Sequence, residues 1–192
     1  MQENVIQNLP EILKKHICTL KKASRDTSNE EPMSESKIKV INFDKIPKEY
    51  AREKGLSCIP KSNDALYVSL EKTWFFMEFK NGSISKEEIY RKIYDSIIIL
   101  VEMGIFPDFD YVRKNVQYIL IYNSEKYDKV SYSESRKQTY GYFMKRAKCE
   151  EKLFGVENFE RFLLQETHTY DKELFHQKFV KKMEQQEMKR SK

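Results

Sequence analysis

The stretch that decides the fold is Thr73-Trp-Phe-Phe-Met-Glu-Phe-Lys80, the most apolar strand-like run in this chain of 192 residues. Side chains on a strand alternate between its two faces. The apolar side chains of this run would therefore divide into two sets, Trp74 and Phe76 on one face and Phe75, Met77 and Phe79 on the other. A strand that is apolar on both faces lies inside a sheet that helices cover on both sides. The run predicts an α/β fold with a central sheet flanked by helices.

The run ends in charge, because Glu78 and Lys80 close it. These two side chains would point the same way, roughly 7 Å apart along the strand. A second carboxylate, Asp64, opens the strand-like run just before it. Two carboxylates and an ammonium at one edge of a sheet can hold a hard divalent cation and orient a water molecule.

The pattern Asn63-Asp64, thirteen residues, then Glu78-Phe79-Lys80 and a helix resembles the PD-(D/E)XK restriction-endonuclease-like nucleases. The resemblance implies that Asp64 and Glu78 bind Mg²⁺ or Mn²⁺, with the main-chain carbonyl of Phe79 as a further ligand. It implies that Lys80 positions or polarises the attacking water. Asn63 stands where that motif has its proline. The implied function is hydrolysis of phosphodiester bonds in nucleic acid, with DNA as the substrate.

The elements predicted around the motif follow the core order of that fold: helix, three strands, helix, strand. The second helix has the clearest boundaries, with a capping box at Ser85 and Glu88 and a C-terminal Gly104. An apolar stripe at helical spacing lies between them. The other predicted elements are an amphipathic helix over 5–20 that begins near Asn8 or kinks at Pro10, strands over 37–43, 64–70, 73–80 and 116–123, and a helical turn over 48–53.

The chain is predicted to form a single domain over 1–192, with the nuclease-like core over 1–123 and a C-terminal elaboration over 124–192. The elaboration is predicted to contain a helix over 133–152, a strand near 161–167 and a charged helix from Asp171 onward. Basic side chains within 135–148 could contact a phosphate backbone. These candidate nucleic-acid-binding residues are Arg136, Lys137, Lys145 and Lys148.

Composition agrees with a globular protein, since 34% of the residues are charged and 40% hydrophobic. No run has the apolar length of a membrane span, and the N-terminus does not read as a signal peptide. Cys18, Cys58 and Cys149 show no metal or disulfide spacing and are interpreted as small buried side chains in a reducing cytoplasm. Of the net charge of +5, the last twelve residues carry +3, so the body is close to balanced.

A shared site requires a particular hairpin register. With a two-residue turn at Glu71-Lys72, Asp64 would fall opposite Phe79 and point away from Glu78. Three irregularities would bring the carboxylates together: a turn with an odd number of residues, a bulge, or an Asp64 that lies just before regular pairing begins. We expect one of these between Asn63 and Lys80, with both carboxylates converging on one solvent-accessible pocket.

Other interpretations remain open at this stage. The three charged residues could simply mark a strand end that emerges into solvent, with Lys80 paired to a carboxylate. The fold could be nuclease-like but catalytically inactive, serving as a nucleic-acid- or protein-binding module. An interaction protein of unrelated α/β fold is a third alternative.

Overall fold

The computed structural model describes residues 1–25, 31–82, 84–126 and 152–189. Its centre is a six-stranded sheet in which the strands follow one another in chain order. The first four strands pair antiparallel, and the last two continue from the fourth in parallel. The strands are β1 (Ile17–Thr19), β2 (Lys39–Asn42), β3 (Ala65–Val68), β4 (Trp74–Lys80), β5 (Val116–Tyr122) and β6 (Glu166–Asp171). The predicted mixed sheet is confirmed.

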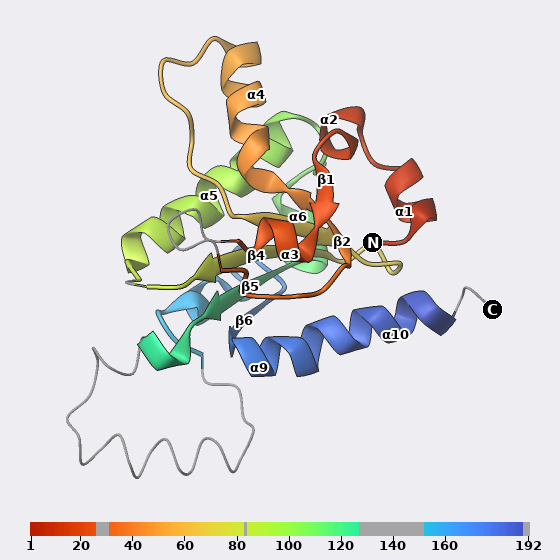
Figure 1. The fold of residues 1–192 in the computed structure, drawn as a ribbon. Helices are drawn as coiled ribbons and strands as arrows, with labels where there is room; N and C mark the ends of the chain where they lie inside the picture. The colour runs from red at the N-terminus through yellow and green to blue at the C-terminus, as the bar shows by residue number, and fades with distance from the viewer. Residues whose placement is uncertain (26–30, 83, 127–151, 190–192) are drawn as a thin grey trace.

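Helices cover both faces of the sheet (Figure 1). The long helix α5 (Lys86–Glu102) lies on one face, where its Lys92 contacts Glu78 of β4. On the other face lie α9 (Lys172–Phe175), a π-helical turn (His176–Val180) and α10 (Lys181–Lys189), whose phenylalanines contact Phe75 and Phe79 of β4. The shorter elements are α1 (Glu3–Gln7), α2 (Glu11–Lys14), α3 (Leu20–Ala23), α4 (Ile46–Lys54), α6 (Phe109–Asn115) and two 3-10 turns (Phe43–Lys45 and Val156–Phe159).

Helix α5 forms as its sequence predicts. The Ser85 hydroxyl caps it by accepting a hydrogen bond from the main-chain N–H of Glu88 at 3.2 Å. After the helix, Gly104 takes a left-handed conformation with φ of 67°, which suits a glycine. The apolar stripe is fully buried against the sheet and comprises Ile89, Ile93, Ile97 and Leu100.

The first predicted helix is wrong in extent. The segment forms two short helices, α1 and α2, and then strand β1. Pro10 separates the helices, because its ring nitrogen has no N–H to donate. Ile17 to Thr19 had helical spacing in the sequence, but they pair with β2, and this sheet pairing overrides the local pattern. Four strands therefore precede α5 where three were predicted.

The β3–β4 hairpin has a three-residue turn, Leu70-Glu71-Lys72. Ser69 donates its main-chain N–H to the Thr73 carbonyl at 2.9 Å, which closes the hairpin. Lys72 takes a left-handed conformation with φ of 63°, as the last residue of such turns commonly does. The odd number of residues sets the register in which Ala65 opposes Met77.

The C-terminal elements follow the prediction with one shift. Strand β6 begins at Glu166, five residues later than predicted, because Arg161 forms a turn and donates its N–H to the Leu164 carbonyl at 2.9 Å. The predicted helix after Asp171 is present, and the Asp171 carboxylate caps it by accepting from the Leu174 N–H at 2.7 Å. The helix predicted over 133–152 lies, apart from its last residue, outside the described residues.

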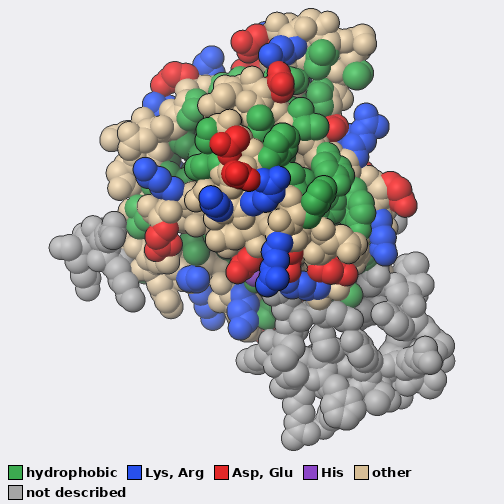
Figure 2. All heavy atoms as spheres, turned by 180° about the vertical axis from the view of Figure 1, so that it is seen from behind, with side chains coloured by type: hydrophobic (Ala, Val, Ile, Leu, Met, Phe, Trp, Pro, Cys, Tyr) green, Lys and Arg blue, Asp and Glu red, His purple; other side chains and the backbone are tan. Residues whose placement is uncertain are grey.

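The surface carries both signs of charge in close mixture. On the face shown in Figure 2, hydrophobic side chains come to the surface between lysine or arginine and acidic side chains. Cys58 is exposed and Cys18 is half-buried, so the predicted burial is wrong for Cys58, whereas Cys149 lies outside the described part of the chain. Among the described residues, no helix combines the length and the apolar character needed to cross a membrane.

Candidate functional site

The candidate site lies where the β3–β4 pairing ends. The last opposed pair is Ala65 and Met77, so the next residues outward, Asp64 and Glu78, would face each other. Asp64 instead donates its main-chain N–H to the Met77 carbonyl at 3.0 Å, one residue out of that register. The odd turn is one of the three irregularities that were expected, any one of which would permit a shared site, and Asp64 also lies just before the regular pairing of β3 begins.

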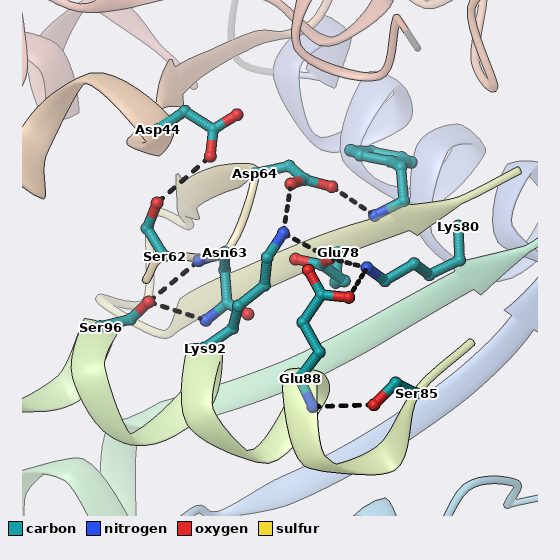
Figure 3. Close-up of polar contacts among 11 residues, drawn as sticks. Asp44, Ser62, Asn63, Asp64, Glu78, Lys80, Ser85, Glu88, Lys92 and Ser96 are labelled. Carbon is teal, nitrogen blue, oxygen red and sulfur yellow. Dashed lines mark hydrogen bonds and ion pairs between the residues drawn. The ribbon is translucent and has the colours of Figure 1, made fainter. Parts of the chain in front are cut away.

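A lysine from α5 joins the two carboxylates (Figure 3). Lys92 Nζ lies 3.1 Å from Asp64 Oδ1 and 2.6 Å from Glu78 Oε1. Lys80 Nζ lies 3.1 Å from the same Glu78 oxygen and 3.4 Å from Glu88 Oε2. We call Asp64, Glu78, Lys80 and Lys92 the acid–lysine cluster. Two negative and two positive side chains thus balance one another within it.

The cluster is largely shielded from solvent, so the prediction that the carboxylates meet in a solvent-accessible pocket is wrong in its exposure. The Glu78 side chain has no exposed surface, and those of Asp64, Lys80 and Lys92 are 16%, 13% and 13% exposed. Glu78 Oε1 contacts both lysines, whereas its buried Oε2 has no hydrogen-bond partner among the described residues. A buried carboxylate oxygen without a partner is costly, so it marks a position where a further ligand would be stabilising.

Burial and charge shift the acid–base properties of the cluster. Burial raises the pKa of Glu78 to about 8, the charge of Asp64 adds to the rise, and Lys92 and Lys80 oppose it. Burial would lower the pKa of Lys92, but Asp64 and Glu78 outweigh it and raise that pKa.

Hydrogen bonds around Asp64 fix its position. Its Oδ2 accepts from the main-chain N–H of Phe79 at 2.7 Å, which ties the carboxylate to β4. The preceding Asn63 donates both its main-chain N–H and its side-chain amide to Ser96 Oγ of α5, at 3.0 and 3.1 Å. Strand and helix thus hold the carboxylate between them (Figure 3).

A third carboxylate, Asp44, lies near the cluster. It follows β2 and accepts a hydrogen bond from Ser62 Oγ at 3.2 Å. Desolvation, together with the charge of Asp64, raises the pKa of Asp44 to about 6. Much of the residue is nevertheless exposed, so solvent moderates this shift. Asp44 therefore belongs to the rim of the site.

The predicted site residues have different outcomes. Asp64, Glu78 and Lys80 are brought together. The Phe79 side chain packs against Phe175 on the opposite face, and the role of its carbonyl as a ligand stays a prediction. The predicted nucleic-acid-binding residues Arg136, Lys137, Lys145 and Lys148 lie outside the described residues.

Sequence reasoning missed Lys92, although a signal for it exists. Glu88, Lys92 and Ser96 recur every fourth residue along α5, each directly before a buried residue of the apolar stripe. Residues four apart share one side of a helix, so this polar row faces the same region as the stripe. A polar row beside a buried stripe predicts contact with polar groups of the sheet.

The donor set fits a divalent cation in its chemistry. Mg²⁺ and Mn²⁺ prefer oxygen ligands, and Asp64 and Glu78 offer carboxylates from neighbouring strands, with one Glu78 oxygen unpartnered within the described chain. No group of three or more histidine, cysteine, aspartate or glutamate side chains with metal-binding geometry occurs in 1–25, 31–82, 84–126 and 152–189. The ammonium of Lys92 contacts both carboxylates at the position that a cation would take.

Comparisons with protein-family models, with curated proteins and with solved structures find no match to this chain.

Proposed function

We propose that the protein is a metal-dependent nuclease that hydrolyses phosphodiester bonds, with DNA as its substrate. The observation that carries the proposal is the convergence of Asp64 and Glu78 from neighbouring strands with Lys80 beside them. The three-residue turn sets the register that places Asp64 and Glu78 on one face of the sheet. The resemblance of the motif to PD-(D/E)XK nucleases supports the same function and the choice of DNA.

In this proposal Asp64 and Glu78 hold Mg²⁺ or Mn²⁺. A bound ion of this kind supplies Lewis acidity toward a phosphoryl oxygen and lowers the pKa of a water ligand. The Lys80 ammonium, 3.1 Å from Glu78, orients the attacking water and offsets negative charge that develops on the phosphate. The hydrogen bond from Phe79 N–H to Asp64 keeps that carboxylate oriented.

The charge balance of the cluster favours an anionic substrate once a divalent ion is held. When Glu88, which pairs with Lys80, is counted, three carboxylates and two lysines sum to −1, so a divalent ion would leave an excess of one positive charge. Such an excess at low solvent exposure attracts a phosphodiester. The predicted basic residues between 135 and 148 would extend this attraction along the backbone of the nucleic acid.

The test is a cleavage assay on duplex DNA, single-stranded DNA and RNA in Mg²⁺, Mn²⁺ or EDTA. We expect cleavage that needs metal and that is lost in Glu78→Gln and Lys80→Ala. Lys114→Ala serves as the control, because Lys114 is exposed and precedes the opposite end of β5. Equal cleavage by the wild type and both site variants would contradict the proposal.

A second function, a catalytically inactive binding module, is favoured by one observation. Lys92 already forms ion pairs with both carboxylates, as it would in a purely structural ion cluster. This alternative predicts binding of nucleic acid or protein that is indifferent to EDTA and unchanged in Glu78→Gln, with no cleavage under any condition.

A further inference from the structure

The position between the two carboxylates is filled by a side chain of the protein itself. Lys92 Nζ contacts the oxygens that Asp64 and Glu78 direct toward each other, Oδ1 at 3.1 Å and Oε1 at 2.6 Å. The remaining Asp64 oxygen is engaged by Phe79 N–H at 2.7 Å. The remaining Glu78 oxygen is buried. An ion held by both carboxylates would therefore share Asp64 Oδ1 with Lys92, and it would compete with the Lys92 ammonium for the place beside Glu78.

The two lysines of the cluster are not equivalent. Lys80 contacts Glu78 and Glu88 but has no ion pair with Asp64, whereas Lys92 contacts both Asp64 and Glu78. Their side chains are equally exposed, at 13%. Loss of either lysine removes one positive charge from beside Glu78, but only loss of Lys92 vacates the position between the carboxylates.

We propose that Lys92 is a built-in competitor for the divalent cation, whose ammonium must leave the Asp64–Glu78 position before a metal ion can enter. This inference rests on the proposed metal site and adds the device that regulates it. Metal binding is then coupled to outward movement of the Lys92 side chain. A metal ion can bind only the small fraction of molecules in which the lysine is already displaced. The apparent metal affinity is therefore lower than the affinity of the open site, in proportion to that fraction.

The inference also explains how Glu78 is tolerated inside the protein when no metal is bound. A fully buried carboxylate needs a counter-charge, and removing its partner is strongly destabilising. Lys92 supplies that charge from α5, across the layer between helix and sheet. The ion pair that permits burial of Glu78 therefore also raises the metal concentration that is needed to fill half of the sites.

The first experiment measures Mn²⁺ binding by calorimetry in the wild type, Lys92→Met and Lys80→Met. We expect Lys92→Met to bind Mn²⁺ about tenfold more tightly than the wild type. In the wild type most molecules have Lys92 between the carboxylates, and the variant removes this competing state. Lys80→Met is the matched control for the loss of one charge, and it should change the affinity far less. Equal effects of the two variants, or weaker binding by Lys92→Met, would overturn the inference.

A second experiment uses the wild type alone, so it does not depend on whether Lys92→Met folds. The protein is treated with acetic anhydride with and without Mn²⁺, and acetylation at each lysine is followed by mass spectrometry. Mn²⁺ should raise the acetylation rate of Lys92 several-fold, because the displaced side chain becomes accessible, and leave that of Lys114 unchanged.

The outcomes separate this inference from the proposed function. Mn²⁺ binding at the site with no change at Lys92 would overturn the competition but leave the metal-dependent nuclease standing. Absence of Mn²⁺ binding in all three proteins would remove the metal site and the inference together. Tighter binding by Lys92→Met without any cleavage activity would support the inference and contradict the nuclease.

Discussion

The two faces of β4 differ sharply at the same end of the strand. On one face Phe79 packs against Phe175, with ring centroids 6.1 Å apart, within a group of aromatic rings beneath α9. On the other face Glu78 and Lys80 enter the acid–lysine cluster beneath α5. Burial of aromatic rings is non-directional, whereas buried charges depend on the presence of every partner. The stability of one face of this strand therefore depends on the volume of its side chains, and the stability of the other face depends on the balance of its charges.

The largest expected effect is on the cleavage rate, which should depend on the charged face of β4 and not on its aromatic face. Lys80→Ala should lower the cleavage rate about a thousandfold, because it removes charge stabilisation from the transition state. Phe175→Leu, on the aromatic face, should leave the rate within a few-fold of the wild type. Single-turnover rates on duplex DNA measure both. A similar loss in the two variants would mean that the faces are not functionally distinct.

The next effect concerns the stability of the aromatic face. Phe175 is almost fully buried, so Phe175→Ala should lower the free energy of unfolding by about 4 kcal/mol. Phe175→Leu retains much of the volume and should cost less than about 1.5 kcal/mol. Urea denaturation followed by circular dichroism gives both values. If the leucine variant were as unstable as the alanine variant, volume would not govern this face.

On the charged face, the effects of two substitutions on the free energy of unfolding should not add. Lys92→Met leaves Glu78 with one fewer counter-charge and should lower the free energy of unfolding by about 3 kcal/mol. Adding Glu78→Gln to that variant should restore more than half of the loss, since the buried charge is gone. The matched pair Lys92→Met with Phe175→Leu should be additive. Additivity in both pairs would contradict the contrast between the faces.

The smallest effect is a pH dependence at the rim. The pKa of Asp44 is raised in the folded state from 3.8 to about 6, so the folded protein binds the proton more tightly than the unfolded chain. The protonated Asp44 stabilises the folded protein fully below pH 3.8, and this contribution is lost as the pH rises through about 6. Asp44→Asn should therefore gain stability relative to the wild type between pH 4 and pH 7. A pH-independent difference in urea midpoint would exclude this role for Asp44.

Local patterns in the sequence predict much of the fold. Helix α5 has its cap, its stripe and its glycine within twenty residues, so neighbouring residues alone determine it. The prediction for the segment around Ile17 fails because its apolar spacing suits a helix, while its pairing with β2 depends on residues twenty or more positions away. Non-local pairing of this kind leaves no trace in a short window of sequence.

The candidate site was predictable only in part for the same reason. Asp64, Glu78 and Lys80 lie at strand ends, which the hydrophobic pattern locates. Their convergence depends on Lys72 taking a left-handed conformation, and the turn contains no glycine that would signal it. Lys92 and Asp44 join the site through the packing of α5 and through the chain after β2, so tertiary structure alone brings them there.

The three-residue turn also limits how the gene for this protein can change in length. Across a turn of three residues, two residues oppose each other only when an odd number of residues separates them, and thirteen separate Asp64 from Glu78. If the strands absorb a one-codon insertion or deletion between them, Asp64 moves to the far side of the sheet in a single mutational step. A two-codon change restores the original parity. Descendants of this sequence that keep both the site and the three-residue turn should therefore differ in that interval by even numbers of residues.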